Sequence, residues 1–110
     1  MDEEQDKNPV ILGEDGELRL SGTWTVEYAT SLRELLLKRI GSQRPTAVDL
    51  SGIEWLDTAG LQLLLALTPL LKEGARVFGA NQDVRRALQV SGVASVLEAH
   101  GVTVDFNSEA

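Results

Sequence analysis

The sequence predicts a single α/β domain in which helices pack against a mixed β-sheet. The first observation is size: 110 residues with 43% hydrophobic content suffice for one core and leave little room for a second module. The second is the alternation of short apolar strands with amphipathic helices along the chain. The third is a strand–helix–strand run of about thirty residues, which is long enough for a crossover between parallel strands.

The N-terminal part is expected to form a β-hairpin followed by the crossover helix. Residues 10–12 and 17–21 are the two expected strands, and their turn lies at Asp15–Gly16, where a positive φ is tolerated. Residues 26–40 read as an amphipathic helix that ends at Gly41. Its expected core side carries Ala29, Leu32, Leu35, Leu36 and Ile40.

The second half continues the same alternation. Residues 47–50 form a strand that we expect Ser51–Gly52 to break, so that residues 53–57 make a loop. The elements expected after this loop are a helix at 58–72, a strand at 75–79, a helix begun by Asn81 and Asp83 and ended by Gly92, a short helix at 93–99 and a last strand at 103–106.

The helix that begins at Thr58 sorts its leucines onto two faces. At one hundred degrees per residue, a broad stripe faces the core: Leu63, Leu64, Leu67, Leu70 and Leu71. Leu61 and Leu65 fall outside this stripe, on a face whose ends are polar: Thr58, Thr68 and Lys72. An apolar strip with a polar rim is typical of a protein-binding surface. The alternative is that a neighbouring helix covers the two leucines.

The residues at the start of this helix have both a structural and a functional interpretation. Asp57 and Thr58 are residue types that cap helices by accepting bonds from free backbone amides. Thr58 is also a candidate phosphorylation site, because free amides and the helix dipole would stabilise a phosphate there, and its charge would repel a docked partner. Gly60 either lets a partner backbone approach or relieves packing in the first turn.

Composition excludes several function classes. The net charge of −7 and the absence of a basic patch argue against binding nucleic acid or an anionic membrane. The chain has no cysteine, which fits a reducing compartment such as the cytoplasm. The apolar run at 61–71 is too short to span a bilayer. Residues 1–8 are acidic and polar, unlike a secretory signal, and we expect them to be a disordered tail.

Signals for catalysis are weak. His100 is the only histidine and has no neighbouring carboxylate motif. The acids Asp49, Glu54 and Asp57 are close in sequence, but paired-acid catalysis would need a pocket of which the sequence gives no sign. No metal-ligand spacing, nucleophile elbow or phosphate-binding glycine loop is found, so we expect no enzyme activity, no metal and no cofactor.

The stretch VDLSGIEWLDTAGLQLLL resembles the signature of the STAS domain, the family named for sulfate transporters and anti-sigma factor antagonists. The resemblance extends from Val10 to Phe106 and includes LRLSGTWTVEYATSLRELL and GARVFGANQDVRRALQVSGV. It implies one STAS domain at residues 9–107, with a mixed sheet flanked by about four helices. It also implies that the protein acts by binding other proteins rather than by catalysis.

The loop separates two roles within this family. Antagonists of anti-sigma factors carry a loop similar to Asp-Ser-Ser-Gly, in which a kinase phosphorylates the second hydroxyl residue, but this chain has Ala59 at that position. The form Asp57-Thr58-Ala59-Gly60 is more similar to STAS subunits of Mla-type lipid-trafficking ABC transporters, where a threonine at the place of Thr58 contacts the ATPase. The residues expected to bind a partner are therefore Asp57, Thr58, Ala59, Gly60, Leu61 and Leu65.

The sequence is compatible with two kinds of partner. The first is the ATPase subunit of such a transporter, which the protein would stabilise or activate. The second is an anti-sigma factor kinase, which the protein would sequester and thereby regulate transcription. The sequence leaves the oligomeric state open.

Overall fold

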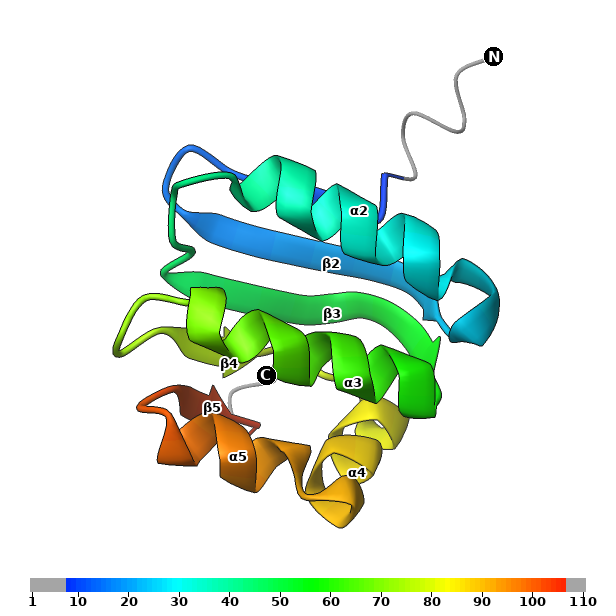
Figure 1. The fold of residues 1–110 in the computed structure, drawn as a ribbon. Helices are drawn as coiled ribbons and strands as arrows, with labels where there is room; N and C mark the ends of the chain where they lie inside the picture. Colours follow the sequence, from blue (N-terminus) through cyan, green and yellow to red (C-terminus); the bar gives the residue numbers. More distant parts are fainter. Residues whose placement is uncertain (1–7, 107–110) are drawn as a thin grey trace.

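The computed structural model describes residues 8–106 as a two-layer α/β domain. Its five strands lie in the order β1-β2-β3-β4-β5, and the long helices cover one face of the sheet (Figure 1). β1 is antiparallel to β2, and the remaining neighbours are parallel, so the predicted mixed sheet is confirmed. The acidic tail predicted at residues 1–8 lies outside the described residues except for Asn8, whose side chain accepts a hydrogen bond from the Val10 amide.

The N-terminal hairpin and the crossover helix form as predicted. β1 (Val10–Leu12) and β2 (Glu17–Trp24) are joined by a turn in which Gly16 has φ 89°. A short 3₁₀ helix, η1 (Val26–Tyr28), precedes α2 (Ala29–Ile40), so the helix predicted from residue 26 begins with a tighter turn. Three side chains of α2 are buried against the sheet: Leu32, Leu36 and Ile40.

The predicted break at Ser51–Gly52 is wrong, because β3 runs without interruption from Ala47 to Leu56. It stays paired with β2 along its length, with register shifts that absorb the irregularity. A Cβ at Gly52 would lie 2.7 Å from the Ser21 Cβ, so this glycine permits close strand approach and does not end the strand. Ile53 and Leu56, expected in a loop, are buried in the core. Their burial stabilises the strand conformation beyond Gly52.

The remaining elements follow the predicted order. α3 (Thr58–Leu67) ends earlier than predicted and continues as the 3₁₀ helix η2 (Thr68–Leu70), which contains Pro69. After it come β4 (Arg76–Phe78), α4 (Gln82–Ser91), α5 (Val93–Ala99) and β5 (Thr103–Asp105). The Asn81 side chain caps α4 by accepting a bond from the Val84 amide at 2.8 Å, as predicted, and Gly92 ends the helix with φ 88°.

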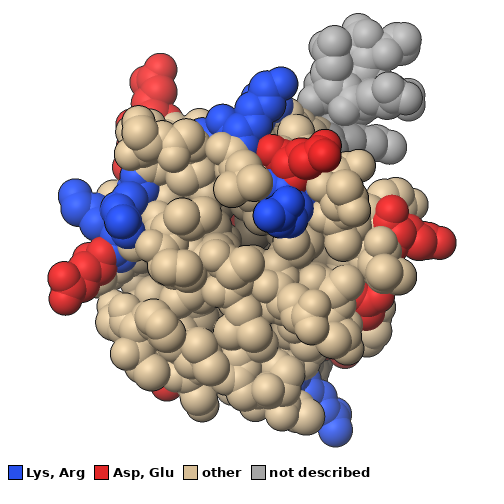
Figure 2. Space-filling view, in the orientation of Figure 1, with Lys and Arg blue, Asp and Glu red and all other residues tan. Residues whose placement is uncertain are grey.

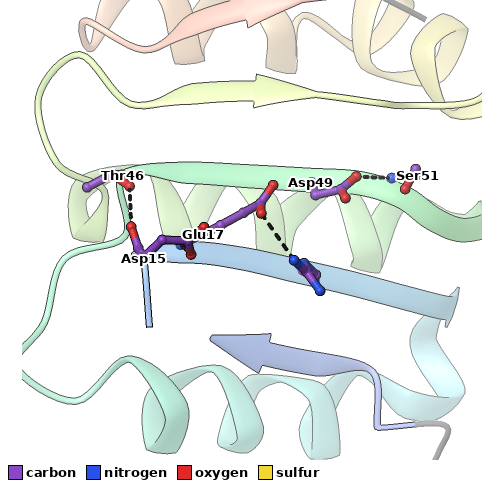
Figure 3. A network of polar contacts seen from close by, with 6 residues as sticks. Asp15, Glu17, Thr46, Asp49 and Ser51 are labelled. Carbon is purple, nitrogen blue, oxygen red and sulfur yellow. Dashed lines mark hydrogen bonds and ion pairs between the residues drawn. The ribbon is translucent and has the colours of Figure 1, made fainter. Parts of the chain in front are cut away.

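The core lies between the helices and one face of the sheet. On β2 and β3 the residues facing the helices are buried: Leu18, Leu20, Val48 and Leu50. Asp49, which lies between Val48 and Leu50 on β3, points to the opposite face of the sheet, which we call the open face (Figure 3). Figure 3 shows this open face, where the Asp49 carboxylate accepts a bond from the Ser51 amide and Arg19 pairs with Glu17 at 3.5 Å. This face carries polar side chains together with the exposed Ile11, which pairs with Arg19 in the sheet register.

Candidate protein-docking surface

Asp57 fixes the start of α3 and joins it to a distant segment. Its Oδ1 atom accepts hydrogen bonds from the amides of Ala59 at 2.9 Å and Gly60 at 3.2 Å, which is the predicted helix cap. Its Oδ2 atom accepts a third bond, at 3.1 Å, from the amide of Val26 in η1. One carboxylate therefore holds two segments that are 31 residues apart in the sequence.

The electrostatic environment of Asp57 favours its ionised form. Partial burial raises the pKa of this carboxyl group, but the backbone amides of Val26, Gly60 and Ala59 together outweigh that effect and hold the pKa below its usual value. The cap is therefore charged at neutral pH. Free backbone amides were expected to stabilise a phosphate on Thr58. The amides of Ala59 and Gly60 are not free, because both already donate hydrogen bonds to the Asp57 carboxylate.

Gly60 is buried against the end of β2. A Cβ at this position would lie 2.1 Å from the carbonyl oxygen of Trp24 and 2.9 Å from the Leu56 Cβ. The same Trp24 carbonyl accepts a hydrogen bond from the Asp57 amide at 3.2 Å. Of the two readings of this glycine, the geometry favours internal packing, and it leaves no exposed surface for a partner at Gly60.

The outward face of α3 differs from the face predicted. Leu61 and Leu65 are half-buried and pack against the core, because α5 lies beside α3 on their side. Thr68, expected at the polar end of an exposed face, is only 4% exposed, and its hydroxyl donates to the Leu64 carbonyl at 3.1 Å. The exposed positions form a row that we call the outer row: Thr58, Gln62, Ala66 and Pro69.

Three exposed apolar or aromatic residues border the Asp57 loop. Val26 is 70% exposed and its amide binds Asp57, while Tyr28 follows two residues later and is 51% exposed. Trp55, also 51% exposed, lies at the end of β3 just before the loop. Tyrosine and tryptophan are enriched in the energetically important parts of protein interfaces. Sequence reasoning missed Val26 and Tyr28, because both were expected to be part of the amphipathic helix at residues 26–40.

The helix face that carries the outer row is almost free of charge. Residues 58–71 contain no charged side chain, although a quarter of all residues in the chain are charged. Figure 2 shows that most of this side of the molecule is uncharged, with charged side chains at its edges and one basic and one acidic side chain near its upper centre. A partner can exclude water from this surface with a small desolvation penalty, because few charged groups lose their hydration.

The other candidate residues do not gather into a chemical site. Asp49 lies on the open face of the sheet, whereas Asp57 is engaged at the start of α3. His100 is exposed, with its Nδ1 atom 3.0 Å from the Val96 carbonyl. Among residues 8–106, no group of three or more histidine or acidic side chains could hold a metal ion. In that same range, no helix has both the length and the apolar character needed to cross a membrane.

The protein is a two-layer α/β domain that presents a capped loop and an uncharged helix face beside one end of its sheet. Residues 9–99 match the family model described as "Mlab, STAS domain". The chain therefore belongs to the STAS domain family, and this membership supports a protein-interaction module as its function class.

A solved structure supports the fold assignment. The chain is similar to the unphosphorylated form of the anti-sigma factor antagonist SpoIIAA, with a TM-score of 0.55 and 18% sequence identity. The alignment covers 84% of this chain and 81% of SpoIIAA. At this identity the similarity shows the fold. A search of curated proteins finds no significant match.

Proposed function

We propose that the protein is a non-enzymatic binding module that docks a partner protein over the Asp57 loop and the outer row of α3. The observation that carries this proposal is the arrangement at Thr58. Its side chain is exposed at a helix start that three hydrogen bonds to Asp57 hold in place. A pre-ordered backbone lowers the entropy that a partner must overcome on binding. The exposed residues Val26, Tyr28 and Trp55 extend the surface around the loop.

The partner that we propose is the ATPase subunit of an Mla-type lipid-trafficking ABC transporter, bound in the cytoplasm. The description of the matching family as "Mlab" supports it. The loop supports it as well, because Thr58 occupies the place of the contacting threonine and Ala59 has no hydroxyl to phosphorylate. In this assignment the outer row contributes Gln62 and Ala66, and the half-buried Leu61 and Leu65 contribute their exposed edges.

The second candidate is an anti-sigma factor antagonist that sequesters a kinase. Its support is the similarity of the fold to SpoIIAA. Because Ala59 cannot accept a phosphate, this role would need constitutive binding or a switch at Thr58. A phosphate on Thr58 would stand beside the Asp57 carboxylate, which already holds the nearby amides, so the two anions would repel each other. We propose that such a modification would prevent docking.

Binding of purified protein to each candidate partner tests the proposal. The variant Thr58→Glu introduces a charge at the centre of the surface, and Thr103→Glu introduces the same charge at an exposed position on β5 as the matched control. We expect Thr58→Glu to weaken binding of the ATPase subunit at least about tenfold and Thr103→Glu to leave it unchanged. Equal affinities for the two variants would contradict the docking surface. Binding of the anti-sigma kinase alone would select the second candidate.

A further inference from the structure

An apolar groove runs between α2 and α3, beside the outer row. It has a volume of about 200 Å³ and is lined by Arg33, Leu36, Leu37, Leu63, Ala66, Leu67 and Leu70. Leu36, Leu63 and Leu67 form its buried floor, whereas the rim carries the exposed residues Arg33, Leu37 and Ala66. Figure 2 shows a hollow near the centre of the uncharged face, with a basic side chain at its margin.

The size of the groove favours a protein side chain over a free small molecule. Sites for small molecules have volumes of about 300–1,000 Å³ and enclose most of the ligand. This groove is smaller and opens to solvent along Leu37, which is 52% exposed although it lines an apolar surface. A space of this size and shape suits one or two apolar side chains that project from a partner's helix.

The charge of the rim limits what can lie beside those side chains. Arg33 is the only charged residue that lines the groove. Within residues 8–106, it has no hydrogen bond or ion pair. The guanidinium group is therefore available to a carboxylate, with which it forms strong two-bond contacts. A basic partner segment would meet uncompensated repulsion at the same place.

We propose that the partner inserts an apolar side chain of an amphipathic helix into this groove and places an aspartate or glutamate against Arg33. This inference rests on the proposed function, since Ala66 belongs both to the outer row and to the rim of the groove. One partner can reach both places, because residues 58 and 66 are about 12 Å apart along a helix. The loop then fixes the position of the partner, and the groove selects an acidic amphipathic helix.

Crosslinking in cells tests which segment occupies the groove. A benzophenone amino acid replaces Leu37, and mass spectrometry identifies the partner peptide that it captures. We expect a helix-forming peptide with leucine, isoleucine, methionine or phenylalanine at helical spacing and an acidic residue within one turn of them. A captured peptide that is basic, or that has no apolar face, would overturn the proposal. So would the absence of a crosslink from position 37 when the same probe at Gln62 captures the partner.

Affinity measurements with the captured partner separate this proposal from the proposed function. Leu37→Glu and Arg33→Glu are compared with matched controls: Ile11→Glu, an apolar residue of similar exposure on β1, and Lys38→Glu on α2. We expect both groove variants to bind the partner at least about tenfold more weakly, and the controls to bind it with unchanged affinity. Replacing the partner's acidic residue by lysine should restore its binding to Arg33→Glu.

Three other outcomes would each contradict a defined part of the proposal. Normal binding by both groove variants, together with weak binding by Thr58→Glu, would refute the groove proposal and leave the docking surface intact. Weak binding by Leu37→Glu but normal binding by Arg33→Glu would refute the acidic partner. Normal binding by all three variants would refute the proposed docking surface itself.

Discussion

Replacing Gly60 by alanine is expected to destabilise the protein, although the same change stabilises most helices. An alanine inside a helix is more favourable than a glycine by about 1 kcal/mol. Here the new Cβ would lie 2.1 Å from the carbonyl oxygen of Trp24, a backbone atom that cannot rotate away. That carbonyl also binds the Asp57 amide, so any shift disturbs the helix cap.

The magnitude follows from these two opposing effects. Overpacking a tight core costs about 1–3 kcal/mol, and contact with backbone places Gly60→Ala at the upper end of that range. After subtraction of the helix gain, we expect a net loss of roughly 1–2 kcal/mol, or a fall in Tm of roughly 5–10 °C. Chemical and thermal denaturation measure both quantities. The control Ala66→Gly, at an exposed position of the same helix, is expected to lose about 1 kcal/mol through propensity alone. A Gly60→Ala protein that melts at or above the parent temperature would refute the packing role of this glycine.

Three further variants test the helix assignment, the cap and the surface. Leu64→Ala is expected to lower the free energy of unfolding by about 2–5 kcal/mol, because the Leu64 side chain is 4% exposed in the core. A variant as stable as the parent in chemical denaturation would contradict the assignment of Leu64 to the core face of α3. Because the pKa of Asp57 is lowered by folding, its ionised form stabilises the protein above the usual aspartate pKa, and that contribution disappears as the pH falls below it. Asp57→Asn should lack this part of the acid dependence of Tm, and an unchanged acid profile would argue against the cap. Thr58→Glu is expected to change the free energy of unfolding by less than about 0.5 kcal/mol, since its side chain is exposed; a large loss of Tm would show a structural role.

Local sequence chemistry predicted those parts of the fold that depend on neighbouring residues. The hairpin turn at Asp15–Gly16 and the cap at Asn81 both arise within a few residues, and both were predicted. The length of the crossover also predicted that β2 and β3 are parallel. These elements were sufficient to define the class of fold.

The errors came from contacts between segments that are distant in sequence. Ser51–Gly52 reads as a strand break, but pairing with β2 and the burial of Ile53 continue the strand past it. Thr68 reads as a polar surface residue, but its hydroxyl binds the Leu64 carbonyl inside the domain. Local propensity carries no information about either tertiary contact.

The candidate site was predicted in part for the same reason. Asp57 was expected to cap α3, because a cap depends only on the next few residues. Its bond to the Val26 amide joins residues far apart in the chain and has no local signal. The half-burial of Leu61 and Leu65 depends on where α5 packs, so their helical positions alone placed them too far outward.

Hydrogen exchange of the protein with and without its purified partner tests the central claim most directly. If the partner docks over the Asp57 loop, binding should slow amide exchange in η1 and in the first two turns of α3, and leave β5 unchanged. β5 serves as the internal reference, because it lies at the far edge of the sheet from α2 (Figure 1). Protection confined to β4 and β5, with none in η1 or α3, would contradict the docking surface.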